Sequence, residues 1–398
     1  MILFIGDGLN GQDSGSIVNL NGPRRFGLSA NIGAFTVMLM RSHWQPRLAA
    51  FIFTMPIPSL HAGQVVLVAG GGEQVTGSAT NCRLHAPFAV DFDGKGNMYI
   101  AEMGGGERVL RVDRQGRLAV FAGTGEKGDS GDGGPATGAQ FNAMHSLAMG
   151  PADDLWIADT WNNRVRRIDT KTQMVFQFAG TGQKGFSGDG GPAAAAQFGN
   201  VYCVAFDAKR ESLYLADLDN RRIRAINLKA GTVTTAAGNG ENGVPKDGAE
   251  AVRSPLVDPR AVAVDSQGNL YILERSGHAL RMVNAKGKIR TVAGTGSKGY
   301  AGDGGDALKA TLNGPKHLCI DRDDNVIIAD TDNHVIRKYV AKENRIVLVA
   351  GSGKSGSRGV GGPASALELN QPHGVCVDNS GTLYIADSLN NRILKLER

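Results

Sequence analysis

The chain has little of what marks a zinc finger, a membrane span or a helical bundle. Its four cysteines include no Cys-x-x-Cys pair, which excludes the usual finger spacing. Its longest apolar run, residues 48–57, has about ten residues, whereas a helix that crosses a bilayer needs roughly 20. No segment shows a sustained apolar period of 3.6 residues, so we predict almost no helix. These absences favour a fold built from strands and turns.

A short phrase that ends in an acid recurs six times along the chain. Successive acids lie 57, 58, 57, 56 and 57 positions apart, and the six are Glu102, Asp159, Asp217, Glu274, Asp330 and Asp387. Self-similarity of this length indicates a solenoid, a propeller or an array. The repeat therefore overrides the length of 398 residues, which alone would suggest two or three domains.

Each unit has the composition of a small antiparallel sheet. In the last unit, residues 369–378, 383–387 and 388–396 form three β-branched and aliphatic runs, separated by clusters of Gly, Asn, Asp and Ser. A fourth run closes earlier units, as in residues 174–180 and 289–294. We therefore predict six four-stranded antiparallel sheets.

Closure of the six sheets into a ring follows from the two ends of the repeat. The sixth unit stops at Arg398 after its third strand, while residues 64–70, before the first unit, match the missing fourth strand. A linear stack would leave two exposed sheet edges, whereas a closed ring leaves short, protected ones. The prediction is an all-β, six-bladed β-propeller in which an N-terminal strand completes the last blade.

The turn after the second strand carries a family signature. Its segments begin at Asn162, Asn220, Asn333 and Asn390, each followed within two residues by Arg or His and an aliphatic residue. In these segments the chain resembles the NHL-repeat family over residues 64–398. The resemblance implies the propeller fold and is a weak guide to activity.

The N-terminal residues belong to something else. Residues 40–47 are basic, residues 48–57 are apolar and Leu60-His-Ala62 resembles a cleavage site, which is the order of a secretory signal peptide. We predict an upstream extension at 1–37, a signal peptide at 38–62 and the propeller at 63–398, in a periplasmic or secreted protein. A single anchoring helix or a core segment is the alternative for the apolar run. Loss of residues 1–62 would lower the net charge from +5 to +3.

The cysteines are predicted to be free thiols. Cys319 and Cys376 fall at equivalent positions of neighbouring innermost strands, where the backbones are expected to lie farther apart than the roughly 7 Å that a disulfide allows between Cα atoms. Buried thiols that act as small hydrophobic groups are the better interpretation for them and for Cys82 and Cys203.

One position at the head of each innermost strand departs from the repeat. It should lie at the mouth of the central channel, and its occupants are Phe88, His145, Tyr202, Arg260, Lys316 and His373. Two cations, two imidazoles and two aromatic rings without an acid would suit an anionic or sugar-like ligand. The alternative is that they are ordinary solvent-facing rim residues.

What repeats in every unit is predicted to be structural. The six acids that end the second strand should accept backbone N–H bonds or pair with an arginine. We assign the same role to the acids at the far end of the first strand, which are Asp91, Asp207, Asp265, Asp321 and Asp378. The crossover loops at Asp132, Asp189 and Asp303 read Gly-Asp-Gly-Gly or similar, which could suggest calcium, but each carries few acids and none is followed by Gly-Lys-Ser/Thr. A compact turn is the preferred interpretation.

A zinc site is a further hypothesis. His145 and His373 share the channel-mouth position in alternate blades, and His278 lies in the turn after Glu274. Three imidazoles with an open fourth position can form a catalytic zinc site. The arrangement is similar to that of the peptidylglycine amidating lyases, whose resemblance implies a channel zinc held by three histidines. The glycine after His373 departs from that family, the disulfides expected there are absent, and His334 at the turn position of His278 suggests that these histidines replace Asn.

Two functions remain open at this point. The first is a monomeric, extracytoplasmic binding module that holds a protein, peptide, glycan or anionic ligand on the face of the channel mouth. The second is a metal-dependent lyase, lactonase or hydrolase, with Arg260 or Lys316 holding an anionic substrate and zinc or calcium as cofactor. Gluconolactonase-like propellers are the precedent for the second. A net charge of +3 and export argue against nucleic-acid binding.

Overall fold

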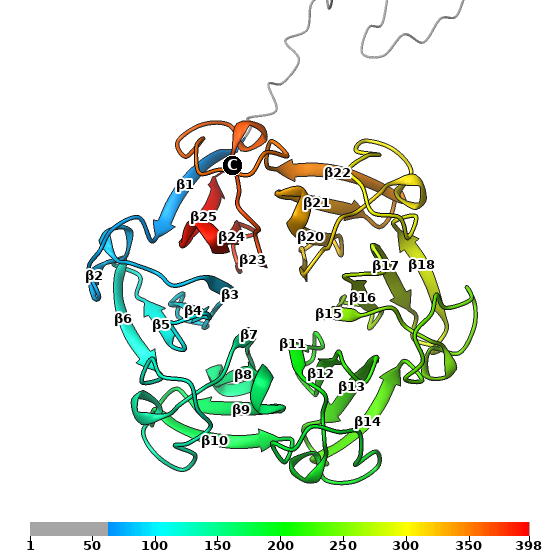
Figure 1. Ribbon diagram of the computed structural model, residues 1–398, viewed down its shortest axis with the longest axis horizontal. Coiled ribbons are helices and arrows are strands. Elements are labelled where there is room, and N and C mark those ends of the chain that lie inside the picture. The colour runs from blue at the N-terminus through cyan, green and yellow to red at the C-terminus, as the bar shows by residue number, and fades with distance from the viewer. Residues whose placement is uncertain (1–62, 398) are drawn as a thin grey trace, which may run out of the picture. The chain divides into compact units, whose positions relative to one another are not determined.

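The computed structural model describes residues 63–397, and the predicted extension (1–37) and signal peptide (38–62) lie outside them. The described chain forms six antiparallel sheets arranged around a central axis (Figure 1). This confirms the six-bladed β-propeller. In each blade the first strand lies nearest the axis and the fourth lies at the perimeter (Figure 1).

The first three blades follow one another along the chain. Blade one contains β3 (Pro87–Phe92), β4 (Met98–Glu102), β5 (Val109–Val112) and β6 (Arg117–Ala122), with the short β2 (Gly77–Ser78) on its outer edge. Blade two contains β7 (Met144–Met149), β8 (Leu155–Asp159), β9 (Arg164–Asp169) and β10 (Met174–Ala179). Blade three contains β11 (Val201–Phe206), β12 (Ser212–Asp217), β13 (Arg222–Asn227) and β14 (Thr232–Ala237).

The last three blades complete the ring. Blade four contains β15 (Pro259–Val264), β16 (Leu270–Glu274), β17 (Ala279–Val283) and β18 (Ile289–Ala293). Blade five contains β19 (His317–Ile320), β20 (Val326–Asp330), β21 (Val335–Val340) and β22 (Arg345–Ala350). Blade six contains β23 (Gly374–Val377), β24 (Leu383–Asp387), β25 (Arg392–Glu397) and β1 (Gln64–Ala69).

Strand β1 closes the ring as the sequence predicted. It pairs antiparallel with β25, with Val65 opposite Leu396 and Leu67 opposite Leu394. Val65 is fully buried, in a hydrophobic cluster that also contains Leu367 and Leu394. The strand that starts the propeller therefore supplies the outer edge of its last blade.

Helical structure in residues 63–397 is limited to ten 3-10 turns of three residues, which agrees with the prediction of almost no helix. Six of them lie in the crossovers between blades: η1 (Ala79–Asn81), η2 (Ala136–Gly138), η5 (Ala193–Ala195), η6 (Ala251–Arg253), η7 (Ala307–Lys309) and η9 (Ala364–Ala366). The others are η3 (Pro151–Asp153), η4 (Thr160–Asn162), η8 (Thr331–Asn333) and η10 (Ser388–Asn390). No helix in this part of the chain is long and apolar enough to cross a membrane.

Each blade buries its two faces against its neighbours. Alternate strand residues such as Ile157, Ile272 and Ile385 are fully buried in clusters that extend from one blade to the next. The four cysteines are unbonded, as predicted. Burial raises the pKa of the thiols of Cys203, Cys319 and Cys376, so they stay protonated and unreactive at neutral pH.

Candidate functional site

The six predicted channel-mouth residues do come together at the axis, and a backbone irregularity helps to aim them. In β3, β7, β11 and β15 the strand pairing shifts by one residue, and the residue left over is Phe88, His145, Tyr202 or Arg260. A bulge of this kind turns a side chain away from the regular alternation of the strand. We call these four, with Lys316 and His373, the mouth ring.

Aromatic and imidazole side chains of the mouth ring contact one another in order around the axis. Phe88 stacks on His373 with ring centroids 3.9 Å apart and meets His145 edge-on at 5.2 Å. His145 meets Tyr202 at 4.4 Å. The Arg260 guanidinium lies over the Tyr202 ring at 3.8 Å. Five consecutive members of the ring therefore form one packed chain from blade six to blade four.

This packing buries most of the ring, so the interpretation as ordinary solvent-facing rim residues is wrong. Phe88 is 5% exposed, His145 8%, Arg260 5% and His373 7%. Tyr202 and Lys316 are half-buried. The ring narrows the channel at this end and places polar atoms in surroundings of low dielectric, where each unmade hydrogen bond is costly.

Arg260 is the most unusual member. No ion pair joins it to an acid within residues 63–397, and its Nη1 is buried without a hydrogen-bond partner. Burial lowers the pKa of Arg260 to about 10, so it stays charged at neutral pH. A buried cation without an acid is rare unless something neutralises it. Its partner is therefore to be sought outside residues 63–397.

The two imidazoles are held neutral and in one tautomer. The Nδ1 of His145 lies 2.9 Å from the carbonyl oxygen of Ala143, and that of His373 lies 3.0 Å from the carbonyl oxygen of Gln371. Each Nδ1–H donates to a carbonyl, which leaves the Nε2 lone pair unprotonated. Burial lowers the pKa of both imidazoles well below the usual value, and the nearby positive charge of Arg260 adds to this effect.

A polar hollow lies between the turns of blades three and four. The hollow has a volume of about 390 Å³ and its lining includes Asp219, Asp258 and Arg275. The Nε of Arg275 donates to Asp258 at 2.7 Å, and Lys316 lies 3.7 Å from Asp332. Arg275 and Lys316, two cations whose charge acts on Arg260 or is acted on by it, therefore already have acidic partners.

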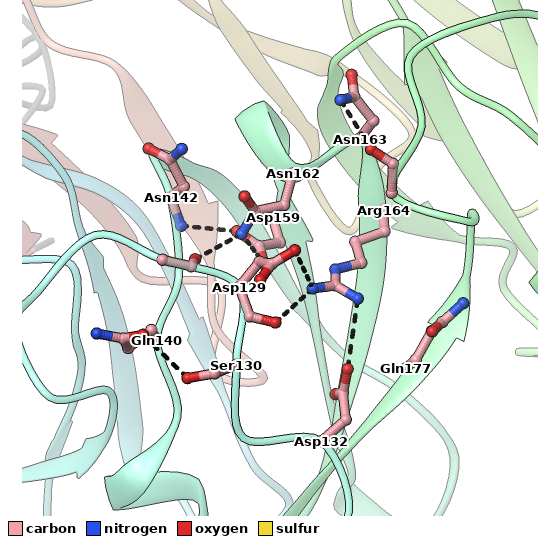
Figure 2. Close-up of polar contacts among 12 residues, drawn as sticks. Asp129, Ser130, Asp132, Gln140, Asn142, Asp159, Asn162, Asn163, Arg164 and Gln177 are labelled. Atoms are coloured by element: carbon pink, nitrogen blue, oxygen red, sulfur yellow. Dashed lines mark hydrogen bonds and ion pairs between the residues drawn. The ribbon is translucent and has the colours of Figure 1, made fainter.

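The acids that end the second strands form the frame around the ring, as predicted. All six are fully buried. Figure 2 shows blade two, where Asp159 accepts the backbone N–H of Asn142 at 2.8 Å and the side-chain N–H of Asn162 at 2.8 Å. Asn162 also donates to the carbonyl of Gly128 at 2.7 Å, and Arg166 lies 3.8 Å from Asp159. The same network of acid, asparagine and crossover glycine recurs in blades three, five and six.

Blades one and four solve the same problem with a longer acid. Glu102 and Glu274 stand where the other blades have Asp, and Gly106 and Gly277 stand where they have Asn. A Cβ added to Gly277 would lie 2.5 Å from Oε2 of Glu274, because the extra methylene brings the carboxylate into the space of the missing asparagine. Glutamate with glycine is therefore a steric substitute for aspartate with asparagine.

The crossover aspartates are bound to arginines. Arg166 contacts Asp132 at 2.9 Å, Arg224 contacts Asp189 at 2.7 Å and Arg337 contacts Asp303 at 2.9 Å. Arg164 also reaches Asp129 and Asp132 (Figure 2). The guanidinium groups occupy the carboxylates that a calcium ion would need, which favours the structural interpretation of these loops.

His278 lies in the frame and not in the mouth ring. It adopts a left-handed conformation with φ of 47°, at the position of Asn163, His334 and Asn391. Its Nδ1 accepts the backbone N–H of Gly314 at 3.2 Å, just as His334 accepts that of Gln371 at 3.2 Å. Both histidines thus replace asparagine as links between neighbouring blades.

The residues of the proposed zinc site therefore do not fit a three-histidine centre. Within residues 63–397 no group of three or more His, Cys, Asp or Glu side chains is placed to hold a metal ion. His145 and His373 both contact Phe88, but the Nδ1 of His278 is already used by the backbone of blade five. Metal analysis of the purified protein is the test of the zinc hypothesis.

Asp91 accepts backbone N–H bonds from Met149 and Phe92, as predicted, but its alignment with the turn acids of the other blades is wrong. The turn acid of blade one is Asp93, whose Oδ1 accepts the N–H groups of Lys95 and Asn97, as Asp265 accepts those of Gln267 and Asn269. Asp91 instead lines the central channel. The spacing could have shown this, because Asp93 precedes Glu102 by nine positions, the interval between Asp265 and Glu274.

His317 is a channel residue that the sequence analysis missed. It follows Lys316, lines the channel below the mouth ring and accepts the Val375 backbone N–H through its Nδ1 at 3.4 Å. Burial lowers the pKa of His317 to about 4, so it is neutral at physiological pH. Its place immediately after the ring position was the available signal.

Comparisons with known proteins agree with this architecture. The NHL repeat model matches residues 369–396, and the teneurin NHL domain model matches residues 195–299. NHL repeat-containing protein 2 of Bos taurus is 25% identical over 342 residues, which cover 78% of this chain and 46% of that protein. SUPPRESSOR OF QUENCHING 1 of Arabidopsis thaliana is 27% identical over 267 residues, or 64% of this chain and 25% of that protein. The chain spans less than half the length of these relatives.

Solved structures share the fold at low sequence identity. An auxiliary nutrient binding protein from Bacteroides ovatus superposes with a TM-score of 0.60 and 15% identity, covering 83% of this chain and 76% of that one. A protein of unknown function from Bacteroides thetaiotaomicron superposes with a TM-score of 0.61 and 15% identity, covering 84% of this chain and 75% of that one. Identity this low establishes the common fold alone.

Proposed function

Because this chain is a six-bladed NHL-repeat β-propeller, we propose that it acts as an extracytoplasmic binding module, whose mouth ring holds an anionic group of a protein, peptide or glycan partner. One observation carries the proposal. Arg260 is a charged side chain that is 5% exposed, has no acidic partner in the described chain and retains an unpaired Nη1. Such a group costs stability, and an arriving carboxylate would satisfy it with a charge-assisted bond.

The other half of the ring suggests what accompanies the anion. Phe88, His145 and His373 form an aromatic cluster that is joined to Arg260 through Tyr202. Trp161 and Leu389 stand at the same turn position in blades two and six and are 49% and 51% exposed. An apolar or aromatic group next to a carboxylate matches this division, because aromatic side chains bind such groups by stacking and burial.

The solved nutrient-binding propeller and the repeat-dominated sequence support a binding role of this kind. The six acids that end the second strands accept structural hydrogen bonds, so they are not available to a ligand. The mouth ring is the part of this face that departs from the repeat. We propose that the propeller works as a monomer, since one chain supplies all six blades of the ring.

A calorimetric titration tests the proposal with a matched pair of probes. N-acetyl-phenylalanine presents an aromatic group and a carboxylate. The second probe, N-acetyl-phenylalaninamide, has the same aromatic group but no negative charge. We expect the wild type to prefer the acid by roughly tenfold or more, because a hydrogen bond to a charged group contributes about 1.5–3 kcal/mol. Arg260→Met should abolish the preference and Arg260→Lys should retain part of it.

Arg253→Ala is the control, since Arg253 is exposed on η6 and pairs with Glu250. It should bind both probes as the wild type does. Equal binding of acid and amide by the wild type, or full preference for the acid in Arg260→Met, would move the site away from the mouth ring.

A further inference from the structure

The central channel contains a second cavity, distinct from the mouth ring. It has a volume of about 390 Å³ and is lined by residues of all six innermost strands, among them Val90, Ala148, Val204 and Val262. None of the six mouth-ring residues contributes to its lining. The cavity reaches the surface at the opposite end of the channel, where the exposed Ala208 and Arg210 form part of its rim. Pockets of roughly 300 Å³ and above are large enough for small organic ligands.

At one level of this cavity the wall residues are small and uncharged except in one blade; Asp207, which also lines the cavity, accepts the N–H groups of its own turn from Glu211 and Ser212. Strand pairing places Asp91 opposite Tyr99, as Ala148 faces Trp156 and Ala263 faces Tyr271. The equivalent residues of the six blades are Asp91, Ala148, Ala205, Ala263, Cys319 and Cys376. Five blades supply alanine or cysteine at this level of the channel. Blade one supplies a carboxylate, which the fold of a blade does not require.

The Asp91 carboxylate has neutral hydrogen-bond donors, and its nearest influence from a cation is the charge of Arg210 at the rim, which forms no ion pair with it. Its Oδ2 accepts the backbone N–H of Met149 at 2.7 Å, and its Oδ1 accepts that of Phe92 at 2.8 Å. The Cys376 thiol lies 3.6 Å from Oδ1. No lysine or arginine of residues 63–397 forms an ion pair with it, and Arg210, the cation at the rim, donates instead to the Gly150 carbonyl at 2.7 Å.

The surroundings favour an organic cation over a metal ion. A metal such as calcium takes six to eight oxygen ligands, and apart from Asp91 this level of the wall offers alanine and cysteine side chains. The innermost strands are sheet edges, however, and edge strands present unpaired backbone carbonyls. A primary ammonium group has three N–H donors, one for the carboxylate and two for such carbonyls.

We infer that this end of the channel binds a small primary amine, with its ammonium group on Asp91 and a short apolar chain against the alanine and valine walls. The site is independent of the mouth ring, because it uses another part of the channel and the opposite charge. It gives the propeller two binding sites of complementary chemistry along one axis.

Titration with n-butylammonium chloride, followed by NMR shifts of backbone amides on β3 and β7, tests the inference. n-Butanol, which has the same apolar chain, and tetramethylammonium, which has charge without N–H donors, are the comparison probes. The wild type should bind n-butylammonium saturably and at least tenfold more tightly than either. Asp91→Ala, which installs the residue of blades two to four, should remove that preference, and Asp91→Asn should weaken it.

Two further variants keep the outcome decisive if the Asp91 variants fold poorly. Ala263→Met fills the cavity without touching the carboxylate and should block binding of n-butylammonium. Arg260→Met, in the mouth ring, should leave it unchanged, so failure here is distinguishable from failure of the proposed anion site. Absence of saturable binding by the wild type, or unchanged binding in Asp91→Ala or Ala263→Met, would overturn the inference.

Discussion

The exchange of aspartate with asparagine for glutamate with glycine predicts a strong energetic coupling that can be measured in blade five. There, Asn333 donates to the Gly299 carbonyl at 2.8 Å and to Oδ2 of Asp330 at 2.8 Å. Asn333→Gly removes both bonds and leaves a buried carboxylate short of a donor. We expect a loss of about 3 kcal/mol of unfolding free energy, from one neutral bond, one bond to a charged group and the added backbone freedom.

Asp330→Glu alone inserts a methylene group into an occupied, fully buried site. We expect it to cost about 2 kcal/mol, the usual range for overpacking being about 1–3 kcal/mol. In the double variant the longer side chain fills the space of Asn333, as Glu274 does over Gly277, where its Oε2 receives two bonds from Arg281 at 2.9 and 2.7 Å. The double variant should lose about 2 kcal/mol, well below the sum of the single losses.

Equilibrium urea unfolding of the wild type, both single variants and the double variant gives the coupling directly. The same cycle in reverse, Glu274→Asp with Gly277→Asn in blade four, is the internal control and should also show coupling of about 2 kcal/mol or more. Additive losses in both cycles would refute the steric substitution and leave the pairing of these residues in blades one and four unexplained.

Three other predictions follow from the frame and the channel. Val65→Asp should lower the free energy of unfolding by about 3 kcal/mol or more, because it buries an unpaired charge in the closing strand β1. The control, Gln64→Asp on the exposed side of β1, should change it by less than about 1 kcal/mol. Similar losses in the two variants would contradict closure by β1. His317 has a pKa lowered to about 4 in the folded chain, so the unfolded chain binds more protons between about pH 6.5 and 4 and the stabilisation by neutral His317 is lost as pH falls through that window. Burial raises the pKa of Asp159, Asp217 and Asp330 to about 6, and protonation of these acids stabilises the folded chain as the pH falls, opposite to the effect of His317. The difference in urea midpoint between wild type and His317→Asn, measured from pH 7.5 to 4.5, therefore isolates the contribution of the histidine. A difference that does not change with pH would disprove the lowered pKa of His317. Metal analysis of the purified protein should find no stoichiometric zinc, because His278 is occupied by the Gly314 N–H, and one zinc per chain that is lost in His145→Ala would revive the enzymatic hypothesis.

The repeat carries most of what could be predicted about the fold. A period of about 57 residues, an incomplete sixth unit and a leftover first strand define the blade number and the closing pair β1 and β25. The acids could be assigned to the frame for the same reason, since a residue needed in every blade is more readily structural than catalytic. The exchange of an Asp–Asn pair for a Glu–Gly pair could not be predicted, because it depends on where two side chains meet across a turn.

The sequence could predict which residues form the candidate site, but not how they pack or how far they are buried. The six mouth-ring residues come from one position of the repeat, so alignment of the units identifies them. Their mutual packing depends on the bulges in β3, β7, β11 and β15, which the residue types at these positions do not predict. Asp91 was aligned with the turn acids because Asp93 lies only two positions on; Asp91 lies within β3 and lines the channel, whereas Asp93 begins the turn after that strand.

The melting temperature of Arg260→Met, recorded together with its affinity for N-acetyl-phenylalanine, tests the central claim most directly. Arg260 is a buried cation without an acidic partner, so replacing it with an apolar side chain of similar length removes an uncompensated charge. If Arg260 is retained for binding, the variant should melt at a higher temperature than the wild type and should lose the preference for the carboxylate probe. A lower melting temperature with unchanged binding would show that Arg260 serves the fold, and would contradict the proposed function of the mouth ring.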